Sequence, residues 1–507
     1  MYESASLADA RRKSVVYAYI HLTANRIISI YADAATLQRA RNYRDSPALT
    51  NQDDSMKTQQ KRIVTALLAA LLITGTAKAA VSEEEAARLG NELTGIGAER
   101  AGNGNGIPEY TGGLRTPPEN YRDDQRYVNP FPEDRELYRI DRSNVDEHKD
   151  RLSPGQIAMI RRFDSFFIPV YETRRTAAYP DSWVEQSKRN ATRVELESSG
   201  NGILNYESGV PFPIPQSGVE VIFNHTSRYR GGSLTRNIAQ AVPQPNGNFT
   251  AVRLTEDITY PTALTDYRPD AHDNILFYFR QTVTSPARLA GNELLVHEKI
   301  NQVAEGRNVW VYNSAQRRVR RAPDVAYDGP GTAADGQRTA DNLDMFNGAP
   351  DRYNWELVGK KEMYIPYNSY KLTSTDLRYE DILKPGHIDQ SLTRYELHRV
   401  WHVRATVKDD VRHIYGQRDF YVDEDSWQIA AVDHYDGRGT LWRVAEAHKL
   451  QSYDVDIPFY AFESLYDLVS GRYIVIGLTN EEVEPYRYNT RRQSSFYTPS
   501  ALRSTGR

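Results

Sequence analysis

The sequence predicts a β-dominated α+β fold, built on one large, mostly antiparallel sheet or half-barrel. From Gly231 onward, strand-like runs follow one another at regular spacing with turn residues between them, as is typical of such sheets. Tyrosine (34 residues) greatly outnumbers phenylalanine (14 residues), which suits a β-rich chain whose sheet faces are partly solvated. The clearest single piece of evidence is the stretch from Gly416 to Leu450, which reads as three strands joined by two tight turns.

In that stretch, Phe420–Val422 leads into a turn at Asp423–Ser426, because short polar side chains favour turns through hydrogen bonds to the nearby backbone. Trp427–Tyr435 follows, and the glycines of Asp436–Gly439 supply the positive φ that a hairpin loop needs. The chain then returns through Leu441–Leu450. Strand alternation predicts one shared face for the side chains of Trp427, Ile429 and Ala431.

Residues 56–79 have the pattern of a cleavable export signal. Three basic residues precede the apolar run Ile63–Ile73, which is too short to cross a bilayer because a span needs about 20 residues. Small residues at positions 77 and 79 then match the pattern that signal peptidase reads. We therefore expect a periplasmic protein whose mature chain begins at Ala80.

The expected signal separates an N-terminal extension from the mature chain. We expect residues 1–55 to be an extension from a start site placed too far upstream; the alternative is a cytoplasmic segment followed by residues 63–73 as an uncleaved anchor. Residues 80–150 form a polar segment rich in glycine and proline. Residues 151–484 are expected to form a single large β-rich domain, and residues 485–507 a tail that frays.

Two of the helices expected after the signal begin with residues that are typical of a helix N-terminus. Ser82 can cap a helix over Ser82–Leu93, and Ser153 with Pro154 begins a helix that runs to about Phe163. A strand over Phe166–Ala178, a helix over Pro180–Glu197 and a helix from Gly218 follow. Asp324–Asp351, rich in Gly, Ala and Asp, is predicted to be a long surface loop or lid.

Outside the stretch from Gly416 to Leu450, the further predicted strands are spaced regularly, with turn residues between them. They are Leu234–Val242, Phe249–Tyr260, Ile275–Thr284, Glu293–Gln302, Val309–Asn313, Lys361–Pro366, Tyr395–Lys408, Ile457–Leu468 and Tyr473–Leu478.

Composition excludes several classes of protein. A net charge of -4 gives no overall basic field for nucleic acid. A mean hydropathy of -0.65 excludes a polytopic membrane protein. The chain has no cysteine, which excludes disulfides and zinc sites with cysteine ligands.

Motifs for metal binding and catalysis are incomplete. His398 and His402 share a strand face, but no glutamate follows His398 as a zincin motif requires. Residues 423–425 resemble half a calcium loop without its glycine and distal glutamate. Asp433 and Asp436 could pair for glycoside chemistry, although aspartate beside a hairpin is ordinarily a turn former. We predict no metal, no cofactor and no catalytic residue.

Aromatic side chains are the better candidates for ligand binding. Ile275, Phe277 and Phe279 share one predicted strand face, and a second face carries Leu397, Trp401, Val403, Ala405 and Val407. Aromatic residues on a strand face are either ordinary core or the wall of a ligand cavity. The residues predicted to line such a cavity are Phe277, Phe279, Trp310, Tyr312, Trp401 and Trp442.

Four stretches of the chain resemble a bacterial envelope family catalogued as domain of unknown function 1329. They are RTAAYPDSWVEQSKRNA, GVPFPIPQSGVEVIFNHTSRYRGG, VWVYNSAQRRVRRAP and DEDSWQIAAVDHYDGRGTLWRVAEAH. That family is described as outer-membrane-lipoprotein-sorting-like and is similar to the Lol lipoprotein carriers. The resemblance implies a large curved antiparallel sheet, or incomplete β-barrel, with a few helices on its concave side and acyl chains held inside. It implies no catalytic residue.

Two functions are compatible with these features. The first is a periplasmic, non-catalytic carrier or chaperone for a lipid or other hydrophobic molecule. The alternative is an accessory docking subunit of an envelope export complex, with an envelope transporter or outer-membrane protein as partner and no carried ligand. The basic run at Arg317, Arg318, Arg320 and Arg321 could meet anionic headgroups or a partner, or it could protect a solvated sheet edge.

Overall fold

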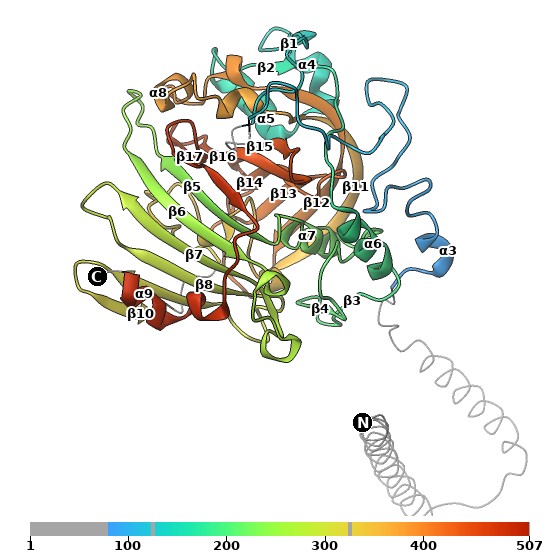
Figure 1. Cartoon of the computed structure of the whole chain (residues 1–507). Coiled ribbons are helices and arrows are strands. Elements are labelled where there is room, and N and C mark those ends of the chain that lie inside the picture. Colours follow the sequence, from blue (N-terminus) through green and yellow to red (C-terminus); the bar gives the residue numbers. More distant parts are fainter. Residues whose placement is uncertain (1–79, 123–126, 323–326, 506–507) are drawn as a thin grey trace, which may run out of the picture. The chain divides into compact units, whose positions relative to one another are not determined.

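The computed structural model describes residues 80–122, 127–322 and 327–505 (Figure 1). All of these belong to one compact unit, Ala77–Arg507. The expected extension, residues 1–55, and the expected signal, residues 56–79, lie outside the described residues. Within the described ranges, no helix combines the length and apolar character that crossing a membrane requires.

A curved sheet of 16 strands forms the centre of the molecule (Figure 1). All neighbouring strands are antiparallel except β2 and β12, and the strand path runs from β1 to β10 without closing on itself. In spatial order, the strands are β1 (Tyr138–Ile140), β2 (Ile168–Val170), β12 (Tyr395–Val407), β13 (Gln417–Asp423), β14 (Ile429–Tyr435), β15 (Leu441–Ser452), β16 (Ile457–Asp467), β17 (Tyr473–Leu478), β5 (Ser233–Ala241), β6 (Ala251–Thr259), β7 (Ile275–Ser285), β8 (Glu293–Lys299), β9 (Asn308–Asn313) and β10 (Arg318–Arg321).

The remaining elements are two further strands of the sheet, a set of helices and a separate short ribbon. β11 (Tyr353–Pro366) pairs with β12, and β18 (Tyr486–Tyr488) pairs with β5. The helices are α3 (Glu83–Ala86), α4 (Val145–His148), α5 (Pro154–Arg162), α6 (Asp181–Asn190), α7 (Gly218–Thr226), α8 (Tyr379–Ile382) and α9 (Pro499–Thr505), and a separate two-stranded ribbon joins β3 (Glu195–Leu196) to β4 (Ile203–Leu204). The prediction of a β-dominated α+β fold with one open, mostly antiparallel sheet is confirmed.

Both faces of the sheet are covered. On the face that we call the inner face, Ile238, Leu254, Phe420 and Leu465 join one apolar cluster with Val221 and Ile222 of α7. On the opposite, outer face, Met159 and Ile160 of α5 pack with Val444 and Tyr466. Because both faces are buried, strands such as β16 and β17 are buried at every position, which explains their nearly continuous apolar character.

Residues 327–350, which we call the plug segment, also cover the inner face. We predicted a surface loop or lid here, but residues 337–350 are nearly all buried. Asp341 pairs with Arg418 and His413, and Asp344 pairs with Arg228 and Arg230. The prediction of a surface loop is therefore wrong for this part, because its acidic side chains pair with buried arginines and histidine instead of facing water.

The C-terminal tail is held in place over the part that the structure describes, residues 485–505, so the prediction that it frays is wrong there. β18 pairs with Arg236, Thr235 and Leu234 of β5. Further on, Tyr497 and Leu502 are buried against the outer-face residues Tyr278 and Leu295. Burial of these two apolar side chains offsets the ordering cost of the tail.

Two β-bulges change which side chains share a face. The register shifts between Ile275 and Phe277, so Ile275 packs with Tyr278 and Tyr497 while Phe277 and Phe279 pack elsewhere. A second shift beside Tyr421 separates Ala431 from Trp427 and Ile429. The alternation assumed in the sequence fails at both places because a bulge inserts one unpaired residue.

Several element lengths also differ from the prediction. The strand expected over Phe166–Ala178 is limited to β2, the helix expected over Ser82–Leu93 to α3, and α6 ends at Asn190. By contrast, α5 begins as predicted, because Ser153 and Gln156 form a reciprocal capping box and Pro154 is its first residue.

Candidate functional site

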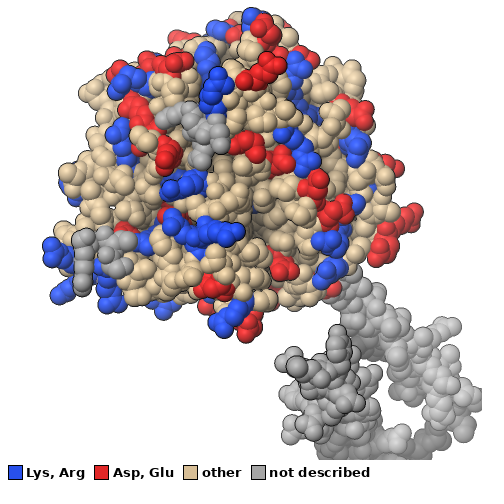
Figure 2. Space-filling view, viewed as in Figure 1, with Lys and Arg blue, Asp and Glu red and all other residues tan. Residues whose placement is uncertain are grey.

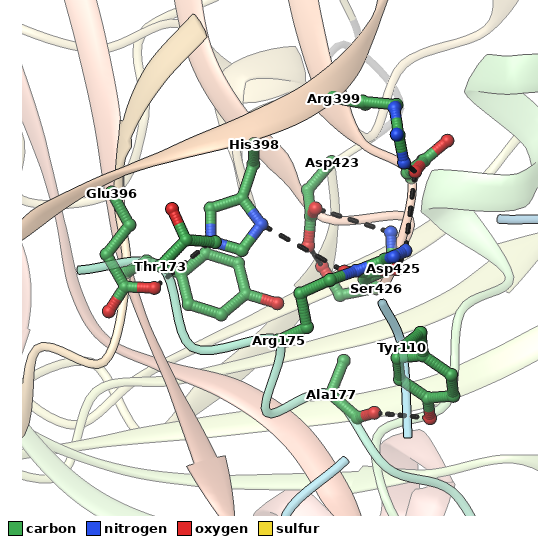
Figure 3. Close-up of polar contacts among 12 residues, drawn as sticks. Tyr110, Thr173, Arg175, Ala177, Glu396, His398, Arg399, Asp423, Asp425 and Ser426 are labelled. Atoms are coloured by element: carbon green, nitrogen blue, oxygen red, sulfur yellow. Dashed lines mark hydrogen bonds and ion pairs between the residues drawn. The ribbon is translucent and has the colours of Figure 1, made fainter. Parts of the chain in front are cut away.

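A buried network of charges surrounds the turn between β13 and β14 (Figure 3). Arg175 donates from Nε and Nη2 to the two carboxylate oxygens of Asp425, at 2.8 and 2.6 Å. Lys449 donates from Nζ to Asp423 at 2.8 Å. These four side chains are at most 2% exposed. The ion pair between Arg175 and Asp425 joins the segment after β2 to the turn between β13 and β14.

His398 lies at the edge of this network, beside Asp423 and Asp425 (Figure 3). Ligand atoms of the three side chains lie within 4.8 Å of one another, a spacing that could hold a metal ion. However, Arg175 and Lys449 already compensate the two carboxylates. His402, which the sequence paired with His398, contacts Asp419 instead, at 3.0 Å. The donor set therefore fits an internal ion-pair network better than a cation.

We expect added zinc, added calcium and added chelator each to leave the melting temperature of the protein almost unchanged. A specifically bound ion at 100 to 1,000 times its Kd would stabilise the fold by about 3–4 kcal/mol, which a thermal melt would resolve. A large fall in melting temperature with chelator would contradict this prediction and show that the protein holds a stabilising metal ion.

A groove of about 690 Å³ lies between two hairpins at the inner-face side of the sheet. One wall comes from the β5–β6 hairpin, with Val242, Phe249 and Val252, and the other from the β7–β8 hairpin, with Val283 and Leu289. The exposed tip of the plug segment closes one side of the groove; the tip residues that line it are Thr332, Ala333 and Asp335.

A smaller inner pocket, of about 50 Å³, lies next to this groove, and Thr332 lines both. Its walls are Phe277, Phe279 and Gln281 of β7 and Leu294, Val296 and Glu298 of β8, together with Arg307. The plug segment covers it with Gly331, Thr332, Arg338, Ala340 and Leu343. Strand pairing explains the grouping, since Phe277 lies opposite Glu298 and Phe279 opposite Val296.

The six aromatic residues predicted to line one cavity are not brought together. Phe277 and Phe279 line the inner pocket. Trp310 and Tyr312 pack in the outer-face cluster with Tyr497 and Leu502. Trp401 stacks on Trp427 with ring centroids 6.3 Å apart, and Trp442 donates from Nε1 to Asp467 at 3.0 Å. The inner pocket and groove thus contain two of the six.

Sequence reasoning did not identify the other lining groups. Arg338 lies in the segment that was interpreted as a surface loop, and Val242, Phe249 and Leu289 lie in or beside the tips of two hairpins. Nothing in the local sequence marks these residues, because they meet only through the pairing of β5, β6, β7 and β8.

The exposed edge of the sheet carries the predicted basic run. Arg317, Arg318, Arg320 and Arg321 are all exposed on and beside β10, and β10 ends the strand path. Figure 2 shows basic side chains at the lower left, the region in which Figure 1 places β10. Charged side chains on an edge strand discourage pairing with other chains.

Comparison with known proteins agrees with the resemblance seen in the sequence. The model of the family described as "Protein of unknown function (DUF1329)" matches residues 139–503. An uncharacterized protein of Pseudomonas aeruginosa is 56% identical over 453 residues, which are 89% of this chain and 100% of that protein.

Two solved structures are also similar. A DUF1329 family protein from Desulfovibrio piger is 14% identical, with 56% of this chain and 97% of that chain covered and a TM-score of 0.40. A LolA superfamily protein from Nitrosomonas europaea is 12% identical, with 56% and 98% covered and a TM-score of 0.34. With the family match over residues 139–503 and a relative 56% identical along its whole length, the chain belongs to the DUF1329 family.

Proposed function

We propose that the protein is a non-catalytic carrier or chaperone of the periplasm that binds a lipid or other hydrophobic molecule. The observation that carries this proposal is the open groove of about 690 Å³ between the two inner-face hairpins. Ligand sites in proteins commonly enclose about 300–1,000 Å³ and are lined mainly by apolar side chains with a few polar groups. Val242, Phe249, Val252, Val283 and Leu289 supply the apolar walls.

The groove, rather than the inner pocket, would hold the hydrophobic part of the ligand. The inner pocket measures about 50 Å³, and the plug segment fills the inner face beside it. An acyl chain in the groove would gain about 0.8 kcal/mol for each buried methylene, so ten carbons could offset the cost of ordering the ligand.

Two observations favour the alternative of a docking subunit without a carried ligand. The plug segment and α7 occupy the inner face, where an acyl-filled cavity was expected, and the basic edge at β10 remains exposed. On this alternative, the groove holds no lipid and β10 contacts an envelope partner.

Leu289→Asp is expected to weaken binding of a fluorescent fatty-acyl probe at least about tenfold, because the new carboxylate would have to be desolvated against the acyl chain. Leu289 is half-buried in the groove, so the substitution should leave the fold intact, which circular dichroism checks. Val469→Asp is the matched control, since Val469 is 75% exposed and does not line the groove. Probe titration gives the affinities, and native mass spectrometry with lipid extraction shows whether lipid co-purifies.

If wild-type protein binds no probe and carries no lipid, the carrier proposal fails and the docking subunit replaces it. If Leu289→Asp and Val469→Asp weaken binding equally, the probe does not occupy the groove.

A further inference from the structure

The inner pocket contains a buried arginine without a partner. Arg338 is 6% exposed, and its Nε and Nη1 atoms are buried with no hydrogen-bond partner. Its side chain forms no ion pair with any residue that the structure describes. Arginine is almost never this buried unless it is paired, because an unpaired charge away from water is costly. An isolated guanidinium in a pocket wall therefore calls for a ligand.

The other charges around the pocket are already matched. Arg307 pairs with Glu298 at 2.8 Å, and Glu298 also accepts a hydrogen bond from Asn347 at 2.8 Å. Gln281 donates to Glu256 at 2.7 Å, and Glu256 pairs with Arg236 at 2.6 Å. Among the described residues that line the pocket, Arg338 is thus the only charged side chain without an ion pair.

Two carboxylates, Glu463 and Glu256, attract Arg338 electrostatically without touching it. Glu463 accepts from the backbone N–H of Met345 at 3.3 Å. Burial and the charge of Asp344 raise the pKa of Glu463 to about 7, so near neutral pH it is only partly ionised. Neither carboxylate neutralises the guanidinium directly.

The backbone holds Arg338 in place without using its side chain. Its carbonyl accepts from Gly331 N–H at 2.8 Å, and Pro330 and Thr339 form a β-bridge beside it. Arg443 donates to the carbonyl of Gln337 at 3.0 Å. A side chain at position 331 would meet Nε of Arg338 at 3.0 Å, so glycine leaves that atom clear. The backbone of Arg338 is therefore held in place, while Nε and Nη1 of its guanidinium are left without a hydrogen-bond acceptor.

We propose that the inner pocket binds an oxyanion, a carboxylate or phosphate group, with Arg338 as its receptor. The guanidinium fork suits such groups because it can donate two parallel hydrogen bonds. The volume of about 50 Å³ has room for roughly three to five water molecules at about 10–15 Å³ each, which matches a head group and excludes an acyl chain. Phe277, Phe279 and Leu343 provide apolar contact for the carbon next to that group.

This inference rests on the proposed function for the apolar part of the ligand only. Thr332 lines both the pocket and the groove, so an acidic amphiphile could place its head group at Arg338 and its tail in the groove. A small free anion could occupy the pocket alone. The two sources share one chemistry at Arg338 and differ in whether a tail adds affinity.

The test compares dodecanoate, dodecanol and acetate on the full chain, with wild type, Arg338→Met and Arg338→Lys. We expect wild type to bind dodecanoate at least about tenfold more tightly than dodecanol, since a hydrogen bond between two charged groups stabilises a complex more than a contact with a neutral hydroxyl does. Arg338→Met should lose that preference and keep its affinity for dodecanol. Arg338→Lys should retain part of it. Arg438→Met should keep it entirely, because Arg438 is an exposed arginine that lines neither the pocket nor the groove.

Each outcome decides between the two proposals. Equal affinities of wild type for dodecanoate and dodecanol, or a preference that survives in Arg338→Met, would overturn the oxyanion site and leave the carrier. If neither acyl compound binds, the carrier fails, and the oxyanion site stands only if acetate raises the melting temperature of wild type but not of Arg338→Met. Without ligand, Arg338→Met should be at least as stable as wild type; marked destabilisation would show a structural role instead.

Discussion

Replacing Asp344 by alanine is expected to lower the free energy of unfolding by about 3–5 kcal/mol, because it leaves two buried guanidinium groups without their carboxylate. Arg228 donates to Asp344 at 2.8 Å, and Arg230 lies 2.5 Å from it. All three side chains are at most 9% exposed. Urea unfolding near pH 7, with the slope of the transition compared between proteins, measures the loss.

Asp344 also fixes the position of the plug segment on α7. The Nε2 atom of His225 lies 2.8 Å from the Asp344 carbonyl, while the Nδ1 atom accepts from Ile429 N–H at 3.1 Å. These contacts imply an Nε2–H tautomer, and burial lowers the pKa of His225 to about 3. The imidazole is therefore neutral at pH 7 and links the plug segment, α7 and β14.

Asp335→Ala is the matched control for this prediction. Asp335 belongs to the same segment and pairs with Arg472, but it is 66% exposed, and exposed ion pairs contribute only about 0–1 kcal/mol. A small decrease in the free energy of unfolding for Asp335→Ala and a large decrease for Asp344→Ala would show that the buried ion pairs of Asp344 stabilise the fold. Similar small losses in both would mean that the plug segment contributes little to folding.

The sequence predicted the sheet well because most strands carry local signals. β5, β7, β12 and the meander β13–β15 begin and end close to the expected residues, since turn residues and alternation specify them within a short window. The start of α5 was also predictable, because its capping box lies within four residues. These features depend on neighbours in sequence and need no knowledge of the rest of the fold.

The errors concern residues whose environment is set by distant parts of the chain. The acidic residues of the plug segment suggested solvent, but Asp341 and Asp344 pair with Arg418 and with Arg228 and Arg230, residues far away in sequence. Of the candidate ligand site, only Phe277 and Phe279 were identified, because strand alternation is local. Arg338 and the groove walls depend on which hairpins are neighbours, which alternation does not specify.

Asp433 and Asp436, which the sequence suggested as a possible carboxylate pair beside the β14–β15 hairpin, lie in two different environments. Asp436 is a turn former as expected, since its Oδ1 accepts from the backbone N–H groups of Arg438 and Thr440 at 2.8 and 2.9 Å. Asp433 instead lies within β14, fully buried on the outer face beneath α5. It accepts from the Ser153 hydroxyl at 3.0 Å, and it forms no ion pair with any lysine or arginine among the described residues.

Burial, together with the charges of Asp419 and Glu446, raises the pKa of Asp433 to about 7. The ordinary value is 3.8. Between these two pH values, the folded protein keeps a proton that the unfolded chain has lost. The stability that this proton contributes is therefore fully present below pH 3.8 and is lost as the pH rises toward 7.

Asp433→Asn is consequently expected to stabilise the protein relative to wild type by an amount that grows between pH 4 and pH 7 and then levels off. The gain at pH 8 should reach about 4 kcal/mol, because the pKa shift from 3.8 to about 7 corresponds to about 1.4 kcal/mol for each unit. Asparagine can still accept from Ser153 through its amide oxygen. Urea unfolding at several pH values measures the difference in the free energy of unfolding between the two proteins, in which titrations common to both largely cancel.

Asp436→Asn serves as the control and should show no such gain, since backbone hydrogen bonds lower the pKa of Asp436. A stability difference for Asp433→Asn that stays flat from pH 4 to pH 8 would mean that Asp433 is ionised in the folded protein, and α5 would then pack on a charge rather than on a neutral acid.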